Sequence, residues 1–269
     1  MAVRAYVRVR GAPPLIPYLP LFPLRTASPE VFQLEAVERG ALAPLLRLLS
    51  SPNIHVILAA TAALRNISIH PRTEARLVQA GFLAPLIFLM SIDRTASRAQ
   101  FVGGGKADAP AAEAHARMLL DIRCHAVSCL RNMIASEASK AAFVSLGGVD
   151  KLVTLLPDAP PALQSEMAAC LAVLALSEMV RDTITKTPAV GLLIGLVHSS
   201  DNADVQGNCA AALGNLAASM AACQQFTQRW ADATTYLLRL VSSDNQTFVY
   251  ISVWTLYHLA KHRTASAAI

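Results

Sequence analysis

Charged and aromatic residues are scarce in this sequence. Of its 269 residues only 15% are charged and 6% are aromatic, whereas 54% are hydrophobic and the mean hydropathy is +0.42. Hydrophobic residues in such excess must be buried against one another, and the abundant alanine and leucine favour helices over strands. We therefore expect an all-α protein with a large buried core, for which the length allows one or two globular domains.

The sequence has no hydrophobic run long enough to cross a membrane. The longest, such as Pro188–His198 (PAVGLLIGLVH), are about half of the roughly 20 residues that a transmembrane helix needs. Clusters of basic residues are missing as well, because the lysines and arginines behind the net charge of +5 are scattered along the chain. We accordingly expect no membrane span and no nucleic-acid binding.

Motifs for catalysis are also absent. We find no nucleophile elbow, no paired carboxylates in a glycine-rich setting and no complete phosphate loop. The segment GGGK (Gly103–Lys106) comes nearest to such a loop, but Gln100 stands where the motif needs its first glycine, and Ala107 replaces the serine or threonine after the lysine. The sequence therefore predicts a protein that is not an enzyme and binds no cofactor.

Cysteine spacing gives no metal site either. The five cysteines are odd in number and each lies in a helical pattern. Cys124, His125 and Cys129 lie close in sequence, but no second ligand pair follows at zinc-site spacing. We interpret the cysteines as small core residues of a protein in a reducing compartment, without a metal.

Acidic residues are missing from the N-terminus, where four arginines precede the first acid, Glu30. This bias resembles a transit peptide, but the five prolines between positions 13 and 23 would break its amphipathic helix. Ala2 follows the initiator methionine, so the glycine that N-myristoylation requires is missing there. Residues 1–29 are predicted to be an irregular leader without a lipidation site.

What the sequence does contain is an internal repeat of about 41 residues. One unit reads ERGALAPLLRLLSSPNIHVILAATAALRNIS, and four related units follow it. The equivalent positions near the ends of the units are Asn66, Asn132, Val173, Asn215 and His258. The last three steps between them are 41, 42 and 43 residues, whereas the first is 66.

Each unit has the pattern of three helices. A short helical segment ends at a glycine (Gly40, Gly81 or Gly147), where a left-handed conformation stops a helix. An amphipathic helix such as APLLRLLS follows and ends in a polar turn such as SPN or SSDNAD, rich in helix breakers and N-caps. The third and longest helix carries small residues, which allow close stacking. Such units cannot bury their apolar faces alone, but they share one core when stacked.

The long first step has a visible cause, an insertion at about 93–117. It holds Gly103–Gly105, polar residues and many alanines, but no repeat pattern. A loop of this length within a compact unit is either functional or disordered. We predict an irregular insertion at this place.

The unit length, the glycine between the first two helices and the L-x-N-L motif of the third helix resemble the armadillo-repeat family. Over residues 30–262 the similarity is to the C-terminal half of armadillo adaptors of the fungal vacuole membrane. It rests on the segments AALRNISIHPRTEARLVQAGFLAPL, RCHAVSCLRNMIAS, QSEMAACLAVLAL, VQGNCAAALGNLA and VWTLYHLAK. The resemblance implies a right-handed superhelical solenoid of about five three-helix repeats. Their approximate bounds are 30–70, 71–137, 138–178, 179–220 and 221–262, with a tail at 263–269.

The same resemblance implies a non-catalytic adaptor on the cytosolic face of the vacuole membrane. Such adaptors act in vacuole inheritance, at nucleus–vacuole junctions and in autophagy and cytoplasm-to-vacuole targeting. They are anchored by an acylated N-terminus and bind extended peptide segments of partner proteins in the armadillo groove. Peripheral membrane association is thus implied by the resemblance alone. An uncapped first repeat would expose apolar surface, which predicts self-association.

Candidate residues for the groove follow from the repeat. Third helices line the concave surface of such a solenoid, so a polar residue that recurs at one place in them forms a ladder. Asparagine both donates to and accepts from a peptide backbone, and arginine adds forked donors for acidic or carbonyl-rich segments. The predicted peptide-binding residues are Arg65, Asn66, Arg131, Asn132 and Asn215. In the alternative interpretation, the asparagines only hydrogen-bond turns between units. The ladder is broken at Val173 and His258.

A nuclear import receptor is the alternative function within the same fold. That family pairs each groove asparagine with a tryptophan one helical turn earlier. Here the residues four positions before the three asparagines are Ala62, Ser128 and Ala211, so the tryptophan array is absent. Trp254 precedes a histidine instead, and we assign Trp254 and Tyr257 to the core and the end cap rather than to the groove.

Overall fold

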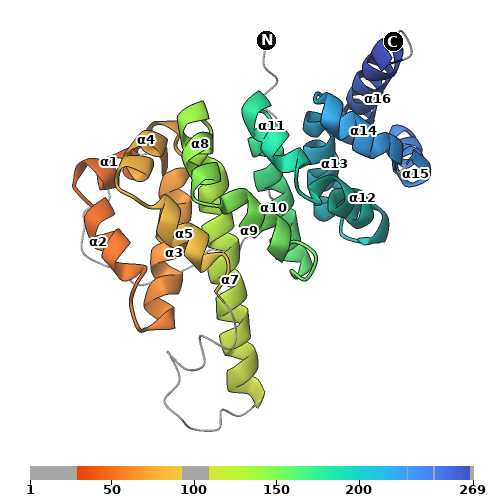
Figure 1. Cartoon of the computed structure of the whole chain (residues 1–269). Helices are drawn as coiled ribbons and strands as arrows, with labels where there is room; N and C mark the ends of the chain where they lie inside the picture. Colours follow the sequence, from red (N-terminus) through yellow and green to blue (C-terminus); the bar gives the residue numbers. More distant parts are fainter. Residues whose placement is uncertain (1–28, 93–108, 229, 245, 267–269) are drawn as a thin grey trace.

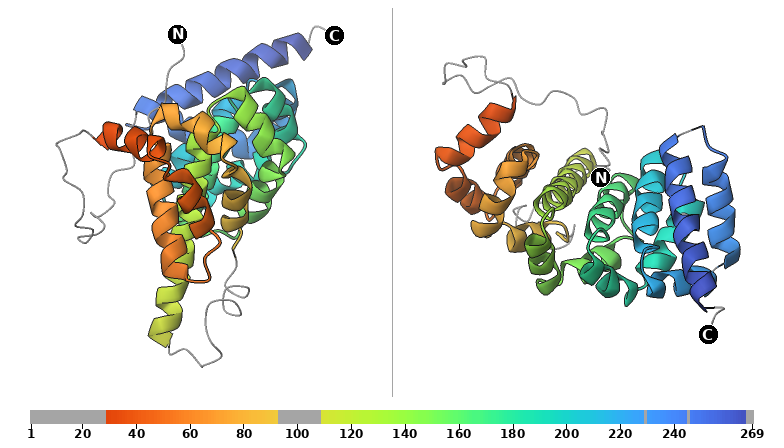
Figure 2. Two further views of the ribbon diagram at one scale, coloured as in Figure 1. Left: turned by 90° about the vertical axis from the view of Figure 1, so that its left-hand side faces the viewer. Right: turned by 90° about the horizontal axis from the view of Figure 1, so that it is seen from above.

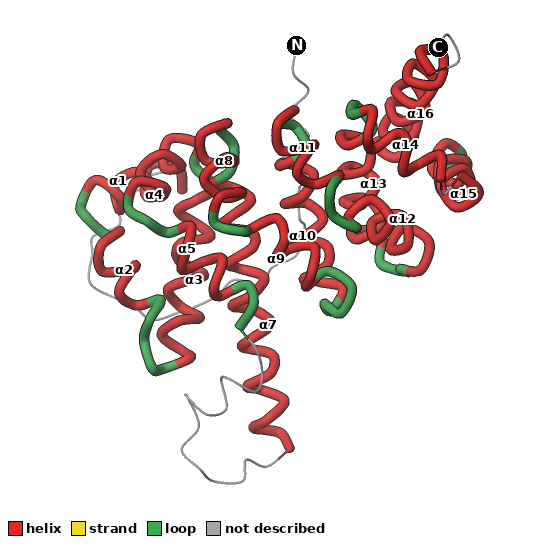
Figure 3. The backbone as a smooth tube through the Cα atoms, viewed as in Figure 1, coloured by secondary structure: helices red, strands yellow, loops and turns green. Residues whose placement is uncertain are grey.

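The computed structural model describes residues 29–92, 109–228, 230–244 and 246–266. These residues form fifteen α-helices and one short 3-10 helix, with no strand among them (Figure 3). The helices follow one another along an elongated stack in which the order in space is the order in sequence (Figures 1 and 2). The prediction of an all-α repeat protein is confirmed.

The helices group into five units of three. The first helices are α1 (Pro29–Glu38), α4 (Glu74–Gln79), α8 (Glu137–Ser145), α11 (Glu178–Thr185) and α14 (Met220–Gln228). The second helices are α2 (Leu42–Leu48), α5 (Leu83–Leu89), α9 (Gly148–Leu155), α12 (Ala189–Ser199) and α15 (Trp230–Val241). The third helices are α3 (Ile54–Ser68), α7 (Ala109–Met133), α10 (Pro161–Leu174), α13 (Ala203–Leu216) and α16 (Gln246–Ser266). The 3-10 helix η1 (Pro71–Thr73) leads into α4.

Local sequence signals determine where these helices begin and end. Gly40, Gly81 and Gly147 have φ angles of 83°, 85° and 71°, the left-handed values predicted for them. A side chain disfavours this conformation, so glycine is the residue that can close the first helix at these points. In the polar turns, Asn53 caps α3 and Asn202 caps α13, each by accepting a hydrogen bond from a backbone N–H of the following turn.

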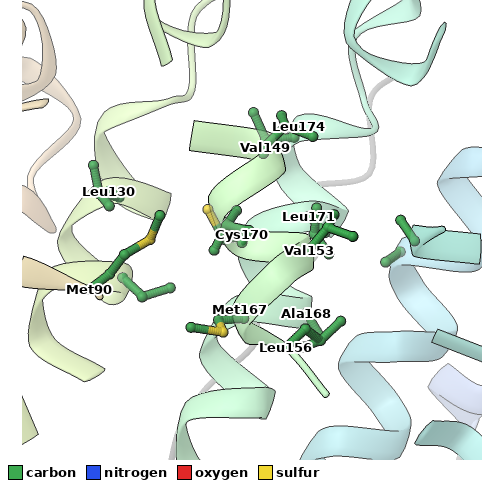
Figure 4. Close-up of a cluster of buried hydrophobic side chains, with 14 of the residues drawn as sticks. Met90, Leu130, Val149, Val153, Leu156, Met167, Ala168, Cys170, Leu171 and Leu174 are labelled. Carbon is green, nitrogen blue, oxygen red and sulfur yellow. The ribbon is translucent and has the colours of Figure 1, made fainter. Parts of the chain in front are cut away.

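One hydrophobic core runs through the units. Figure 4 shows its middle, where Met90 and Leu130 lie on one side of Met167, Cys170 and Leu171 from the next unit. The third helices pack in succession, α3 on α7, α7 on α10, α10 on α13 and α13 on α16. Each unit therefore buries its apolar face only with the help of its neighbours.

Element boundaries differ from the expectation in three places. Residues 109–117, assigned to an irregular insertion, are helical and begin α7, which projects beyond the other third helices (Figure 1). Their sequence, APAAEAHAR, is rich in alanine, which favours a helix without any repeat pattern. The rest of the predicted insertion, 93–108, lies outside the described residues, as does the leader up to residue 28. Pro29 already belongs to α1, and α16 continues to Ser266, into the predicted tail.

Both ends of the stack expose apolar side chains. Leu48 of α2 is 42% exposed, whereas its equivalent in the next unit, Leu89 of α5, is only 2% exposed. At the other end, Tyr250, Trp254 and Tyr257 are exposed on α16, with successive ring centroids 6.4 and 6.1 Å apart. The assignment of Trp254 and Tyr257 to the core is therefore wrong. Both lie on α16, the last helix of the described stack, where Trp254 packs edge-on against His258 with ring centroids 4.6 Å apart.

Candidate peptide-binding surface

The five predicted binding residues all lie in the last turn of a third helix. Arg65 and Asn66 are on α3, Arg131 and Asn132 on α7, and Asn215 on α13. The third helices pack side by side in sequence order (Figures 1 and 2). Residues at equivalent positions in their last turns therefore form a row across the stack. We call this row the ladder surface and follow it from one pair of helices to the next.

Between α3 and α7 the link is an asparagine. The amide Nδ2 of Asn132 donates to Oγ of Ser68 at 3.0 Å, and that hydroxyl donates to the carbonyl oxygen of Arg65 at 2.8 Å. The side chain of Asn66 is exposed and has no hydrogen-bond partner among the described residues. Asn132 thus keeps one N–H and its carbonyl oxygen for a further partner, and Asn66 keeps its whole amide.

Between α10 and α13 two asparagines make the link. Asn215 donates from Nδ2 to the carbonyl oxygen of Ala172 at 2.9 Å. Asn208, two helical turns earlier, donates to the hydroxyl and the carbonyl oxygen of Ser165 at 2.9 and 3.2 Å. The asparagines thus do bond between units, as the alternative interpretation held, but to the preceding third helix rather than to a turn. Because the bond from Asn215 to Ala172 uses only one N–H of the amide, a second N–H and the carbonyl oxygen stay available.

Between α7 and α10 the link is an ion pair, and here Val173 breaks the asparagine ladder. Nη1 of Arg131 lies 3.0 Å from Oε2 of Glu166, and the two side chains are only 20% and 15% exposed. Nη2 of Arg131 also donates to Oγ of Ser128 at 3.3 Å. With water largely excluded, solvent and salt screen this attraction less than they screen a surface pair. The ion pair therefore holds these two helices where an asparagine is missing.

Between α13 and α16 the link is close packing. A Cβ atom on Gly207 would lie 2.8 Å from Cε1 of Phe248, and one on Gly214 would lie 3.2 Å from Cγ2 of Ile251. The first distance is one that real Cβ atoms essentially never show and the second is tighter than most, so a side chain at either position would force Phe248 or Ile251 to move. The packing explains why Gly214, and not an arginine, precedes Asn215.

The surroundings of Arg65 differ from those of Arg131. His125 on α7 occupies the position of Glu166 on α10, since each lies seven residues before the ladder position of its helix. Burial and the positive charge of Arg65 lower the pKa of His125, against an opposing effect of Asp121, so the imidazole is neutral at pH 7. Its Nδ1 atom is buried and has no hydrogen-bond partner among the described residues. Arg65 itself has no carboxylate within ion-pair distance in the described part of the chain.

The cysteine thiols near this row are protonated at neutral pH. Burial, together with the charges of Glu166 and Asp121, raises the pKa of Cys124 to about 12, and burial raises those of Cys129 and Cys170 to about 12. A protonated thiol is a poor nucleophile and a poor metal ligand. Within the described ranges, no three His, Cys, Asp or Glu side chains are grouped as metal ligands, and no helix is both long and apolar enough for a bilayer.

Sequence reasoning missed three residues of this surface. His125, Glu166 and Asn208 carry its charge pattern and part of its linkage, yet none was selected from the sequence. All three lie seven residues before a ladder position, which is about two helical turns and hence the same helix face. A search at that spacing in each unit would have found them.

Comparison with known proteins agrees with this geometry. The family model described as Armadillo/beta-catenin-like repeat matches residues 33–69 and 177–218. Designed armadillo repeat protein YIII(Dq)4CqI superposes with a TM-score of 0.70 at 24% sequence identity, covering 86% of this chain and 87% of that one. The chain is an armadillo-repeat solenoid. A second designed armadillo protein, solved in complex with the peptide (KR)4, has a TM-score of 0.68 at 21% identity and covers 86% of each chain.

Among natural proteins, this armadillo chain is similar to Vacuolar protein 8 of several fungi. The protein of Schizosaccharomyces pombe is 40% identical over 238 residues, which are 87% of this chain and 39% of the relative. That of Saccharomyces cerevisiae is 36% identical over 233 residues, 85% of this chain and 36% of the relative. The chain thus spans less than two fifths of the length of these curated relatives.

Proposed function

We propose that the ladder surface binds extended peptide segments of partner proteins and that the protein is a non-catalytic adaptor. The observation that carries this proposal is the row of asparagine amides with unused N–H and C=O groups, next to an arginine that has no described counter-ion. Neighbouring helices are about 8–10 Å apart, a distance that about three residues of an extended chain span. One peptide could therefore bond to several third helices through its backbone.

The cellular setting is part of this proposal. The relatives carry the name Vacuolar protein 8, and this supports a place at the vacuole for the present chain. We infer a peripheral position on the cytosolic face of the vacuole membrane, with the adaptor roles in vacuole inheritance, nucleus–vacuole junctions and autophagy that the sequence resemblance implies. Recruitment of peptide segments from proteins of these processes is the activity we assign to the ladder surface.

The double charge reversal Arg65→Glu and Arg131→Glu tests the assignment. In a pull-down with peptides from vacuole-inheritance or junction proteins, we expect retention to fall at least about tenfold, because fixed positive charges become negative ones. The matched control is Arg47→Glu with Arg76→Glu, which reverses two exposed arginines on a second and a first helix rather than on the third helices. Circular dichroism must show that both double variants are folded. Equal binding by wild type and a folded ladder variant would contradict the proposal.

Self-association is a further part of the proposal, and it rests on the two ends of the stack. Leu48 is exposed at one end, where the next unit buries its equivalent Leu89, and Trp254 is exposed at the other. A hollow of about 420 Å³, lined by Val37 and Leu46 among others, lies between this first unit and α4 of the second. Exposed apolar areas of this kind favour association.

Size-exclusion chromatography at two concentrations measures this effect. We expect earlier elution at the higher concentration, and a smaller shift for the variant Leu48→Ser with Trp254→Ser. Phe88→Ser is the control, since Phe88 is exposed on α5, in the second of the five units rather than at an end. A monomer at both concentrations would rule the inference out.

A further inference from the structure

Arg65 and Arg131 are equivalent in sequence but not in charge environment. Both precede an asparagine in the last turn of a third helix. Arg131 meets the carboxylate of Glu166 there, at 3.0 Å. Arg65 meets α7, where the same position holds the neutral His125.

Equivalent residues of successive third helices lie at equivalent places in the stack. Asn132 bonds to the hydroxyl of Ser68, which itself bonds to the carbonyl oxygen of Arg65, and Asn215 bonds to the carbonyl oxygen of Ala172, the equivalent of Arg65 in its unit, so successive third helices lie in the same register. The residue before the asparagine then approaches the following helix at the position seven residues before its own ladder position. The Arg131–Glu166 pair shows this contact directly, and the shared register puts Arg65 opposite His125 in the same way.

We propose that Glu166 competes with the acidic side chain of a bound peptide for Arg131. Only Arg65 then binds an aspartate or glutamate of the partner. The inference rests on the proposed peptide-binding function and names the chemistry of the peptide. A carboxylate that approaches Arg131 meets a cation already neutralised by Glu166 and is repelled by that second carboxylate. A carboxylate that approaches Arg65 meets a full positive charge beside a neutral ring, and gains a charge-assisted hydrogen bond.

The remaining units indicate where along the bound peptide an acidic residue is recognised. The position of the two arginines is taken by Ala172 in α10, Gly214 in α13 and Tyr257 in α16, none of which carries a charge. The fitting ligand is therefore an extended segment with one acidic residue over α3 and α7. Over α10 and α13 no arginine of the ladder surface selects a charged residue, and the backbone of the segment bonds to Asn215.

Exchanging His125 and Glu166, the residues at the positions opposite Arg65 and Arg131, tests this inference. The probes are fluorescein-labelled octapeptides of alternating Asp and Glu, (DE)4, and of alternating Asn and Gln, (NQ)4, titrated with the full chain in fluorescence anisotropy. We expect wild type to prefer (DE)4, Arg65→Gln to weaken its binding about tenfold, and Arg131→Gln to change it less than about twofold. His125→Glu should act like Arg65→Gln, because the new carboxylate would pair with Arg65 as Glu166 pairs with Arg131.

The opposite exchange should increase binding. Glu166→His releases Arg131, and we expect affinity for (DE)4 to rise about five- to tenfold. In the double exchange, His125→Glu with Glu166→His, the preference for (DE)4 should return but depend on Arg131 instead of Arg65. Thermal melts of each variant confirm that the chain is folded at the assay temperature.

Each outcome decides the inference. It is overturned if Arg65→Gln and Arg131→Gln weaken binding equally, or if Glu166→His brings no gain, including the case in which no variant binds (DE)4. A gain in Glu166→His alone, without measurable binding by wild type, supports the competition. If the exchange of residues gives the expected results but the partner peptides are not retained in the pull-down, the adaptor function is refuted and the competition between Glu166 and the peptide is not. If the partner peptides bind equally well whatever residues stand at positions 166 and 125, the competition is refuted and the adaptor function is not.

Discussion

Replacing Phe143 by alanine is expected to lower the free energy of unfolding by about 3–5 kcal/mol. Phe143 lies on α8 in the middle unit and is 0% exposed. Its ring covers Gly148 at the start of α9, where a Cβ atom would lie only 2.4 Å from Cζ of the ring. Alanine leaves a cavity that α9 cannot fill without moving. Urea denaturation followed by circular dichroism measures the loss as a lower midpoint at similar slope.

Phe88 provides the matched control for this prediction. It is also a helical phenylalanine but is 62% exposed, so Phe88→Ala should cost less than about 0.5 kcal/mol. Gly148→Ala gives a second check, since its new methyl group overlaps the ring and should cost about 1–3 kcal/mol. In the Phe143→Ala background that cost should disappear because the methyl group enters the cavity. Strictly additive effects of the two substitutions would show that the ring does not pack on Gly148.

The fold could be predicted because its signals are local and repeated. Left-handed glycines, polar capping turns and a 41-residue period each depend on a few neighbouring residues, and five copies reinforce one another. The glycines at 40, 81 and 147 have the predicted conformation. Where the repeat is absent, the prediction of an irregular segment was wrong, because residues 109–117 are helical through alanine propensity alone. Trp254 does lie within the repeat pattern, but the prediction that it is a core residue was wrong, since the described chain has no following unit to cover it.

The ladder surface could be predicted only in part. The repeat places Arg65, Asn66 and Asn132 on neighbouring third helices, as expected from their equivalent positions. It does not say which side chain of the next helix each of them meets, because that depends on the register between helices distant in sequence. Glu166 is therefore invisible as the partner of Arg131 until the two helices are placed side by side. The proposed role of these residues in peptide binding remains a prediction.

Removing the carboxylate of Glu166 is expected to have the second large effect. Glu166→Gln leaves the guanidinium of Arg131, 20% exposed, with the hydroxyl of Ser128 as its remaining side-chain partner in the described chain. An ionised group kept from water without its counter-ion is costly, and we expect unfolding to be easier by about 2–4 kcal/mol. The double variant Arg131→Met with Glu166→Met should be close to wild type, since no charge is then left unpaired. Urea denaturation of the two variants makes the comparison.

Glu35→Gln is the control for this pair, because the Arg39–Glu35 pair is exposed and should contribute less than about 1 kcal/mol. The cost of Glu166→Gln should also persist in 1 M salt, which removes effects between exposed charges. Equal, small losses for Glu35→Gln and Glu166→Gln would mean that Arg131 finds water as soon as its partner is gone. If the expected difference is found, stability and acid binding respond oppositely to the loss of Glu166. The same carboxylate then stabilises the contact between α7 and α10 and keeps Arg131 from binding a partner's acidic residue.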